Sequence, residues 1–441
     1  MARSGLATAE FLSKRGARVT VSDNRPAAGL DTELRLLAEH SVQCETGGHT
    51  VERFLQSDLI IVSPGVPLSI PALERAKQAG IEIISEIELA SRYLQGRVIA
   101  ITGTNGKTTT TTLVGEILRT GGFTVQVGGN IGTPLISLVE SSRTESWNVV
   151  ELSSFQLEAV PAFRPDIAVI LNITPDHLDR YRSLDEYAQA KFNIFRNQTG
   201  GDFAVLNAED PRLAAVASEV RSEVFWFSGY REVTRGVGCD GEQMLLRIGD
   251  SRQTILPRHS VPLKGQHNLE NVAAAISTAH LAGVPSDRIA RAVQNFKAVE
   301  HRLEPVAEIA GVWFYNDSKA TNVDATIKAV EAFESGLILI LGGRDKGGNF
   351  RDLSLLVRKR VKRLVLLGEA REKIRLQLEG TAPITDASSI DDAVQLSFKQ
   401  AAVGDTVLLA PACASFDMFQ NYEHRGREFK ASVARLARGE R

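Results

Sequence analysis

The chain has few cysteines, no excess of charge of one sign and no long hydrophobic run. Its 441 residues include three cysteines, Cys44, Cys239 and Cys413, and this scattered, odd set matches neither a disulfide framework nor a zinc-binding pattern. The net charge of −2 predicts no broad surface for nucleic acid or anionic lipid. No apolar run approaches the roughly 18 residues of a membrane-spanning helix, and the N-terminus has no signal-peptide core. We therefore expect a cytoplasmic protein that binds neither nucleic acid nor membrane.

The remaining composition is that of a globular protein. It is 43% hydrophobic and 24% charged, and its length suggests about three domains. Strand and helix patterns alternate along the chain, which predicts an α/β fold with domains over residues 1–95, 96–298 and 299–441. We expect the first and third domains to be Rossmann-like. The middle domain is expected to be a mostly parallel sheet of the P-loop ATPase type, with helices on both faces.

The first region has an unusual beginning. A helical pattern covers residues 5–14, and strands are expected near residues 17–23, 58–63 and 81–84. A Rossmann-like half normally opens with an apolar strand before its glycine-rich turn, and none precedes this helix. Either the natural start lies upstream, or the chain is shortened, or the domain folds without its first strand. We favour a missing start.

Residues 220–256, with glycine-rich turns that include Gly229, Gly236, Gly238 and Gly241, are expected to form an antiparallel excursion from the middle sheet. A helix is expected over 268–282. In the third region, strands are expected over residues 312–316, 336–343, 363–368 and 406–410.

The most informative stretch is residues 98–112, Val-Ile-Ala-Ile-Thr-Gly-Thr-Asn-Gly-Lys-Thr-Thr-Thr-Thr-Thr. An apolar strand, a glycine-bearing loop and a helix with Lys107 and Thr108 at the turn predict a phosphate cradle. Lys107 would reach the terminal phosphates, and the Thr108 hydroxyl can ligate Mg²⁺. The general P-loop pattern would place its first glycine at Ile101, whereas this chain has Gly103.

Polar side chains also follow other expected strands. Glu151 ends an apolar strand and is a candidate Mg²⁺ ligand, or else a solvated strand-end acid. His177 follows the next strand and is either a ligand of a second metal or a structural histidine. Lys191 has apolar neighbours on both sides, and composition alone does not reject a surface lysine.

Later loops offer further candidates. Asn268 is either a helix cap or part of a binding site, and Asn271 lies one turn later. Arg302 offers a planar fork for phosphate oxygens. Three further strand-end loops, each of which could equally be an ordinary polar turn, cover residues 315–322, 342–349 and 412–417, the last followed by Tyr422 and Arg425.

Taken together, these motifs resemble the Mur ligase family of bacterial cell-wall synthesis, over essentially the whole chain. Residues 102–109 look like that family's own version of the phosphate loop. Within the family, the branch that adds D-glutamate is indicated by the motifs at residues 128–134, 151–157, 342–346 and 415–417, together with Arg425 and Gly426.

The resemblance implies an ATP-dependent ligase that joins D-glutamate to UDP-N-acetylmuramoyl-L-alanine through an acyl phosphate. It further implies two Mg²⁺ ions, one held by Thr108 and Glu151 and one by His177 and Lys191, with Lys191 carbamylated and therefore anionic. Lys107, Glu151, His177 and Lys191 form the expected catalytic set. The chain is expected to act as a monomer.

The resemblance also implies three groups of binding residues. ATP would be bound by Gly103, Thr104, Asn105, Gly106, Lys107, Thr108, Thr109, Asn268, Asn271, Arg302 and Asp317. The D-glutamate region would include Ser318, Lys319, Thr321, Lys346, Ser415, Phe416 and Tyr422. The uridine-nucleotide side would include Asp23, Asn24, Arg25, Gly65 and Asn130.

Other functions fit the sequence less well. A sibling ligase for a diamino acid is disfavoured because the third region has no Asp-Asn-Pro-Arg element, and a folate-type ligase should lack the first region. The chain lacks the Asn-Lys-x-Asp guanine reader of a signalling GTPase. A non-catalytic nucleotide-binding relative stays open, although Lys107, Glu151, His177 and Lys191 argue against it.

Overall fold

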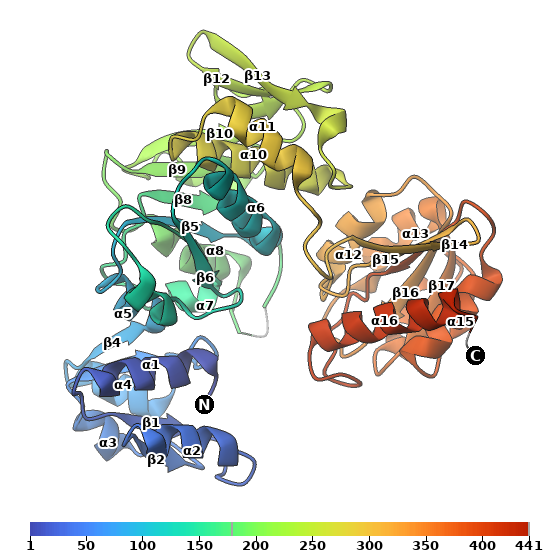
Figure 1. Ribbon diagram of the computed structural model, residues 1–441. Helices are drawn as coiled ribbons and strands as arrows, with labels where there is room; N and C mark the ends of the chain where they lie inside the picture. The colour runs from blue at the N-terminus through green and yellow to red at the C-terminus, as the bar shows by residue number, and fades with distance from the viewer. Residues whose placement is uncertain (178–179, 440–441) are drawn as a thin grey trace.

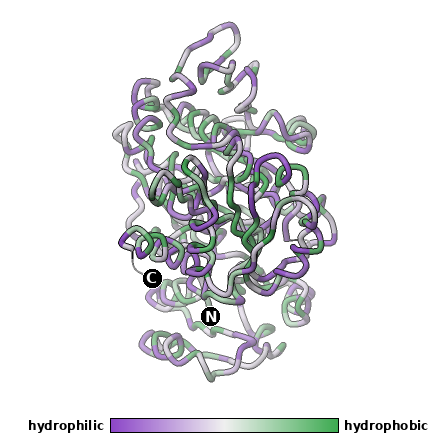
Figure 2. Tube along the Cα trace, turned by 90° about the vertical axis from the view of Figure 1, so that its right-hand side faces the viewer, coloured by the Kyte–Doolittle hydropathy of each residue, from purple (hydrophilic) through white to green (hydrophobic). Residues whose placement is uncertain are grey.

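The computed structural model describes residues 1–177 and 180–439. Its three lobes follow one another along the chain (Figure 1), with the blue N-terminal lobe below the central one and the orange-red C-terminal lobe beside it. Helices alternate between hydrophilic and hydrophobic stretches (Figure 2), as expected where one face of each helix packs on a sheet. Among the described residues, no helix is both long and apolar enough to cross a membrane.

The N-terminal lobe alternates helices and short parallel strands. β1 pairs with β2 and β3 pairs with β4, which gives two separate two-stranded sheets. The first described element is α1, so no described strand precedes it. The elements are α1 (Arg3–Lys14), β1 (Thr20–Asp23), α2 (Asp31–Glu39), β2 (Gln43–Thr46), α3 (Val51–Leu55), β3 (Leu59–Val62), α4 (Pro71–Gln78), β4 (Glu82–Ser85) and α5 (Glu86–Ser91).

The central lobe is built on a nine-stranded sheet of order β13-β12-β11-β10-β9-β8-β5-β7-β6. Its elements are β5 (Arg97–Thr102), α6 (Lys107–Thr120), β6 (Val125–Gly129), η1 (Leu135–Ser141), β7 (Trp147–Glu151), α7 (Ser154–Leu157), β8 (Ile167–Ile170), α8 (Leu184–Phe192), η2 (Asn193–Phe195), β9 (Phe203–Asn207), α9 (Pro211–Val216), β10 (Glu223–Phe227), β11 (Arg235–Cys239), β12 (Gln243–Ile248), β13 (Ser251–Pro257), η3 (Arg258–Ser260), α10 (Gln266–Leu281) and α11 (Ser286–Asn295).

Strand alternation explains why this sheet is covered on both faces. On β5, Ile99 and Ile101 pack into a core with α6, α10 and α11, whereas Val98 and Ala100 pack into a core with α5, η1 and α8. Successive side chains of a strand point to opposite faces, so a continuous apolar run belongs to a strand that is buried on both sides. The predicted helix–sheet–helix layering is confirmed.

The C-terminal lobe has a six-stranded sheet of order β14-β15-β19-β16-β17-β18, in which only the β14–β15 pair is antiparallel among the described strands. Its elements are β14 (Glu304–Ile309), β15 (Val312–Asn316), α12 (Val323–Glu331), β16 (Leu337–Gly342), η4 (Phe350–Leu353), α13 (Ser354–Arg360), β17 (Val361–Leu367), α14 (Arg371–Leu378), β18 (Ile384–Asp386), α15 (Ile390–Gln400), β19 (Thr406–Leu409) and α16 (Tyr422–Ala437).

Two local predictions were wrong. Residues 220–256 are not antiparallel throughout, because β10 pairs in parallel with both β9 and β11, and antiparallel pairing begins at β11 and β12. Asn268 does not cap α10, since the helix begins at Gln266 after Gly265. The Asn268 Nδ2 instead donates to the carbonyl of Lys264 at 2.6 Å.

Candidate functional site

The phosphate loop lies between β5 and α6, at the carboxyl edge of the central sheet. Gly106 precedes the helix with a φ of +85°, a conformation that glycine adopts without steric strain. The Lys107 Nζ donates to the carbonyl oxygens of Gly103 at 2.9 Å and Thr104 at 2.7 Å. Burial lowers the pKa of Lys107, and the carboxylate of Glu151 opposes that shift. The loop therefore folds over its own lysine at the positive end of a helix.

Glu151 occupies the end of β7, which pairs with β5 on the side opposite β8. Its side chain is only 2% exposed, so the interpretation as a solvated strand-end acid was wrong. Asn130 Nδ2 donates to its Oε1 at 2.8 Å. Its Oε2 is buried and has no hydrogen-bond partner among the described residues. A buried carboxylate oxygen without a partner is costly and is a suitable ligand for a hard cation.

Lys191 projects from α8 beneath the same loop. It is 1% exposed, which excludes a surface lysine. Its Nζ donates to the Gly103 carbonyl at 2.9 Å and lies 4.6 Å from the centre of the Tyr187 ring. Burial, followed by the nearby charge of Lys107, holds the pKa of Lys191 well below its ordinary value. Both effects disfavour the charged ammonium relative to the neutral amine.

His177 follows β8 with a φ of +54°. Its ring packs edge-on against Phe155, with 4.8 Å between ring centres, and its Nε2 lies 3.8 Å from Asp176 Oδ2. It faces the same cleft as Glu151 and Lys107. These contacts are compatible with both sequence interpretations, a metal ligand and a structural histidine.

The C-terminal lobe supplies the opposite wall through the loop after β15. Burial raises the pKa of Asp317 to about 7 and lowers that of Lys319 to about 7. The Lys319 Nζ lies 3.9 Å from the centre of the Tyr422 ring. Arg302, in the segment between the two lobes, donates to the Thr108 hydroxyl through its Nη2. This wall therefore touches the phosphate loop directly.

The loops that carry Ser318 and Ser415 are held by a buried arginine that sequence reasoning did not assign to the site. Arg425 is 1% exposed, and its guanidinium donates to Ser318 Oγ at 3.0 Å and to the carbonyls of Ser318 and Cys413. Burial lowers the pKa of Arg425 to about 10. Ser415 is buried, whereas Phe416 is 62% exposed.

A cleft of about 860 Å³ unites most of the predicted residues and draws on all three lobes. The predicted residues that line it are Gly65, Thr104, Asn105, Gly106, Lys107, Thr109, Asn130, Glu151, His177, Asn268, Asn271, Arg302, Asp317, Lys319, Thr321 and Lys346. Five further predicted residues lie just behind this lining: Gly103, Thr108, Lys191, Ser318 and Tyr422. They are joined to the lining by the contacts given above and by the 2.8 Å hydrogen bond from Ser318 Oγ to the Tyr422 carbonyl. Ser415 and Phe416 are not part of the lining.

Three predicted residues of the N-terminal lobe are not brought to this cleft. Asp23, Asn24 and Arg25 lie at the end of β1 and are not among the residues that line it. There the Arg25 guanidinium pairs with the Asp23 carboxylate, with 3.0 Å between Nη2 and Oδ2. Gly65 is the predicted N-terminal residue that does reach the cleft, and Arg180 Nη1 donates to its carbonyl at 3.3 Å.

Sequence reasoning missed several residues of the cleft. Asn172 braces the phosphate loop, since its Oδ1 accepts from the Asn105 backbone N–H at 2.9 Å. Asp324 and Thr174 meet across the two lobes, with Thr174 Oγ1 donating to Asp324 Oδ2 at 3.0 Å. The residues after β8 were visible as a polar cluster, whereas no local pattern marks Asp324.

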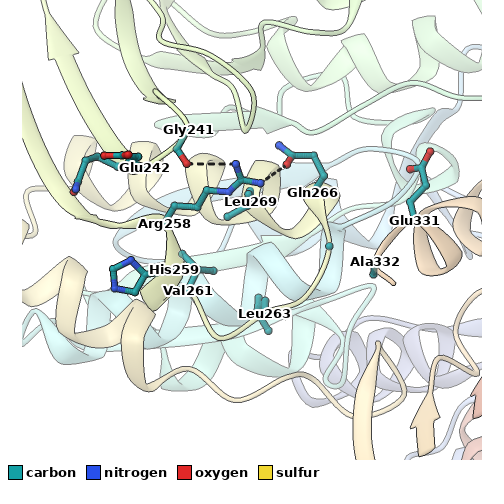
Figure 3. A pocket seen from close by; sticks show the side chains of 12 residues that line it. Gly241, Glu242, Arg258, His259, Val261, Leu263, Gln266, Leu269, Glu331 and Ala332 are labelled. Carbon is teal, nitrogen blue, oxygen red and sulfur yellow. Dashed lines mark hydrogen bonds between the residues drawn. The ribbon is translucent and has the colours of Figure 1, made fainter. Parts of the chain in front are cut away.

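A second cavity of about 770 Å³ lies between the β12–β13 region, the start of α10 and the end of α12 (Figure 3). Arg258 crosses it, donating to the carbonyl of Gly241 at 3.4 Å and to Gln266 Oε1 at 3.0 Å. None of the predicted site residues is among the described residues that line it. Among the described residues, this cavity and the phosphate cleft share no lining residue.

Three domain families match the chain, in the order of its lobes. They are the Mur ligase MurD-like N-terminal domain over residues 1–85, the Mur ligase middle domain over 101–279 and the Mur ligase glutamate ligase domain over 301–413. Among solved structures, a pseudomurein peptide ligase type C from Methanothermus fervidus has a TM-score of 0.64 at 18% identity, covering 99% of this chain and 98% of that one. Another, MurF from Acinetobacter baumannii, has a TM-score of 0.62 at 17% identity, covering 89% and 93%.

Curated relatives are much more similar in sequence. UDP-N-acetylmuramoylalanine–D-glutamate ligase of Acidobacterium capsulatum is 52% identical over 435 residues, which cover 98% of this chain and 94% of the relative. The protein of the same name from Koribacter versatilis is 49% identical over 441 residues, which cover 100% and 97%. The three matched domains and these full-length relatives agree, and the chain belongs to the Mur ligase family.

Proposed function

We propose that this protein is an ATP-dependent amide ligase that adds D-glutamate to UDP-N-acetylmuramoyl-L-alanine, in the cytoplasmic synthesis of peptidoglycan precursors. The observation that carries the proposal is the three-lobed cleft, in which the phosphate-loop Lys107 and the buried Glu151 face the basic side chains of Lys319 and Arg302. The names of the curated relatives point to the same reaction.

The proposed reaction has two displacements. An oxygen of the L-alanine carboxylate attacks the γ-phosphorus of ATP, the bond to the bridging oxygen breaks, and ADP leaves an acyl phosphate. The neutral amine of D-glutamate then attacks the acyl carbon, the bond from that carbon to the phosphate oxygen breaks, and inorganic phosphate departs with the proton that the amine loses as the amide forms. The first step brings a carboxylate to an anionic phosphate, and the second builds negative charge on the acyl oxygen. Positioning and charge neutralisation are therefore the main contributions of the protein.

The phosphate loop and the facing wall would provide that neutralisation. Lys107 would move from the loop carbonyls to the terminal phosphates, where the nearby anion would raise its pKa and favour its charged form. Arg302 would hold a phosphate oxygen from the other side, and Asn271 and Asp317 would contact the nucleoside. The N–H groups of residues 103–109 would surround the phosphates.

The donor atoms fit a bound Mg²⁺. The unpartnered Oε2 of Glu151 and the hydroxyl of Thr108 are hard oxygen donors near the phosphate loop. Such an ion would withdraw charge from the phosphates when bound. We propose that a second ion is held by His177 and by a carbamylated Lys191. The burial and the lowered pKa of Lys191 support that modification, because only the unprotonated amine reacts with carbon dioxide.

The substrates would approach from the outer lobes. We propose that Lys319, Thr321, Lys346 and Tyr422 surround D-glutamate, and that Ser415, which lies outside the cleft lining here, reaches it when the lobes close. Gly65 and Asn130 would guide the nucleotide sugar toward Glu151. Asp23, Asn24 and Arg25 would contact its distant uridine end. We further propose domain boundaries after residues 95 and 298, and a monomer, since one chain contributes every residue of this set.

The deciding experiment measures phosphate release from ATP with UDP-N-acetylmuramoyl-L-alanine and one of four amino acids: D-glutamate, L-glutamate, L-lysine or meso-diaminopimelate. Release that requires both the nucleotide sugar and D-glutamate is the expected result. Release with L-lysine or meso-diaminopimelate instead would assign a sibling ligase. A protein that binds ATP and releases no phosphate under any condition would contradict the proposal.

A further inference from the structure

One carboxylate crosses from the C-terminal lobe to the phosphate loop. Asp324 lies in the first turn of α12, and its Oδ2 accepts from Asn105 Nδ2 at 2.6 Å and from Thr174 Oγ1 at 3.0 Å. Both donors belong to the central lobe, 219 and 150 residues away in sequence. Asp324 thus bridges two lobes.

The start of α12 is shaped to present this bridge. Asn322 caps the helix, with its Oδ1 accepting from the Ala325 N–H at 2.7 Å. The amide nitrogen of the same side chain donates to Asp176 Oδ2 at 3.2 Å, again across the lobes. The helix end is therefore fastened at two neighbouring points, which together restrict its rotation as well as its distance from the central lobe.

The central-lobe partners are themselves fixed to the nucleotide site. Asn105 lies two residues before Lys107, and its backbone is held by Asn172 through two hydrogen bonds of 2.9 Å and 3.2 Å. The Thr174 N–H donates to Thr104 Oγ1 at 3.0 Å. Asp324 is consequently connected to the phosphate loop by a short chain of hydrogen bonds.

We propose that Asp324 is a positioning residue that docks the C-terminal lobe on the phosphate loop and thereby sets the affinity for ATP. The proposal rests on the proposed ATP-dependent function. A carboxylate is a stronger acceptor than a neutral group, and docking before nucleotide binds lowers the entropy lost when both walls close on it. The dock keeps Asp317 and Lys319, which precede α12, opposite Lys107.

The test begins with Asp324→Ala. We expect the KM for ATP and the Kd of a non-hydrolysable ATP analogue to rise about tenfold, while kcat changes by less than about threefold. X-ray scattering of the nucleotide-free protein should show a larger radius of gyration. Thermal unfolding should move little, because the lost contacts join lobes rather than build a core.

Matched variants locate the effect. Thr174→Val removes one of the two donors at nearly constant shape and should raise the analogue Kd by a smaller factor. Asp324→Asn retains an oxygen acceptor and should be less impaired than Asp324→Ala. Asp352→Ala removes an exposed acid of the same lobe outside the cleft and should behave like the wild type.

The proposal would be overturned if Asp324→Ala bound the analogue within twofold of the wild type and scattered identically. It would also be overturned if Asp352→Ala were as impaired as Asp324→Ala, because the loss would then not depend on the contacts with Asn105 and Thr174. Analogue binding and scattering require neither D-glutamate nor turnover. A failure of the ligase proposal would therefore leave this test interpretable.

Discussion

At the scale of single residues, the site is dominated by charged groups that have been removed from water. Lys107 and Lys191 both donate to the carbonyl of Gly103, at 2.9 Å in each case. Two ammonium groups sharing one carbonyl repel each other, and burial lowers the pKa of each. Loss of the proton from Lys191, or its conversion to an anion, would relieve the repulsion.

This arrangement gives a prediction for Lys191. Removing carbon dioxide and bicarbonate from the buffer should lower the phosphate-release rate of the wild type, and adding bicarbonate should restore it. Lys191→Ala should lose at least about 100-fold in kcat, the range typical of lost electrostatic stabilisation, and bicarbonate should not rescue it. Carbon-13 labelling should give a carbamate resonance in the wild type alone. A fully active Lys191→Ala would refute the carbamate.

Asp317 gives a prediction for stability. Its folded pKa of about 7 lies above the unfolded value of about 3.9, so the folded state binds more protons between pH 4 and 7. Stability contributed by this group therefore falls as pH rises through that window. Asp317→Asn mimics the protonated form and should stabilise the protein above pH 7, with an upper limit of about 4 kcal/mol.

The increase in the free energy of unfolding of Asp317→Asn should fall short of that limit. The Asp317 side chain is partly exposed, and Arg302 favours its charged form. Urea unfolding at pH 4, 5.5 and 8 measures this increase. The variant should be close to the wild type at pH 4 and show its largest gain at pH 8, although the substitution should weaken ATP binding. A gain that is equal at all three pH values would contradict the linkage.

At the scale of elements, the sequence predicted what depends on local pattern. The strand–loop–helix unit at β5 and α6 is found where the apolar run and Gly-Lys-Thr place it. β14 was not predicted, because it begins directly before Pro305 and is stabilised by antiparallel pairing with β15. The direction of β10 was also missed, since parallel or antiparallel pairing is set by partners elsewhere in the sheet.

The phosphate loop approaches α10 closely at Gly106, where only a residue without a side chain fits. A Cβ there would clash with Asn271 Oδ1, and the φ of +85° disfavours other residues. Gly106→Ala should therefore weaken binding of an ATP analogue by more than about tenfold. Gly122 has a similar φ of +93°, but a Cβ at that position would have no atom of the described residues within 4 Å.

Gly122→Ala is consequently the matched control. Its backbone strain should cost about 1–2 kcal/mol of stability while leaving the affinity for the analogue unchanged. Calorimetric titration and thermal unfolding of both variants separate the two effects. Equal losses of analogue affinity in Gly106→Ala and Gly122→Ala would show that strain alone, rather than the contact with Asn271, is responsible.

At the scale of the whole molecule, the cleft depends on how three lobes are arranged, and no local pattern in the sequence encodes that. Glu151 and His177 could be proposed as neighbours because they end strands of one sheet. The meeting of Asn105 with Asp324 could not, because 219 residues and a lobe boundary separate them. The same limit applies to Lys191, because its burial depends on the phosphate loop that packs over it as well as on Tyr187 of its own helix.

The arrangement also predicts a motion. Figure 1 shows the C-terminal lobe beside the central lobe and apart from the N-terminal lobe, although Gly65 and Lys346 line one cleft. Both substrates must reach the γ-phosphate in a site from which water is excluded, and closure of the outer lobes would achieve this.

X-ray scattering with an ATP analogue and the nucleotide sugar together should show a smaller radius of gyration than the free protein. Each ligand alone should reduce the radius of gyration less, because a ligand favours the closed form only through the contacts that it gains when the lobes close. An unchanged radius at saturating concentrations of both would mean that the lobes of the free protein already stand in their catalytic positions.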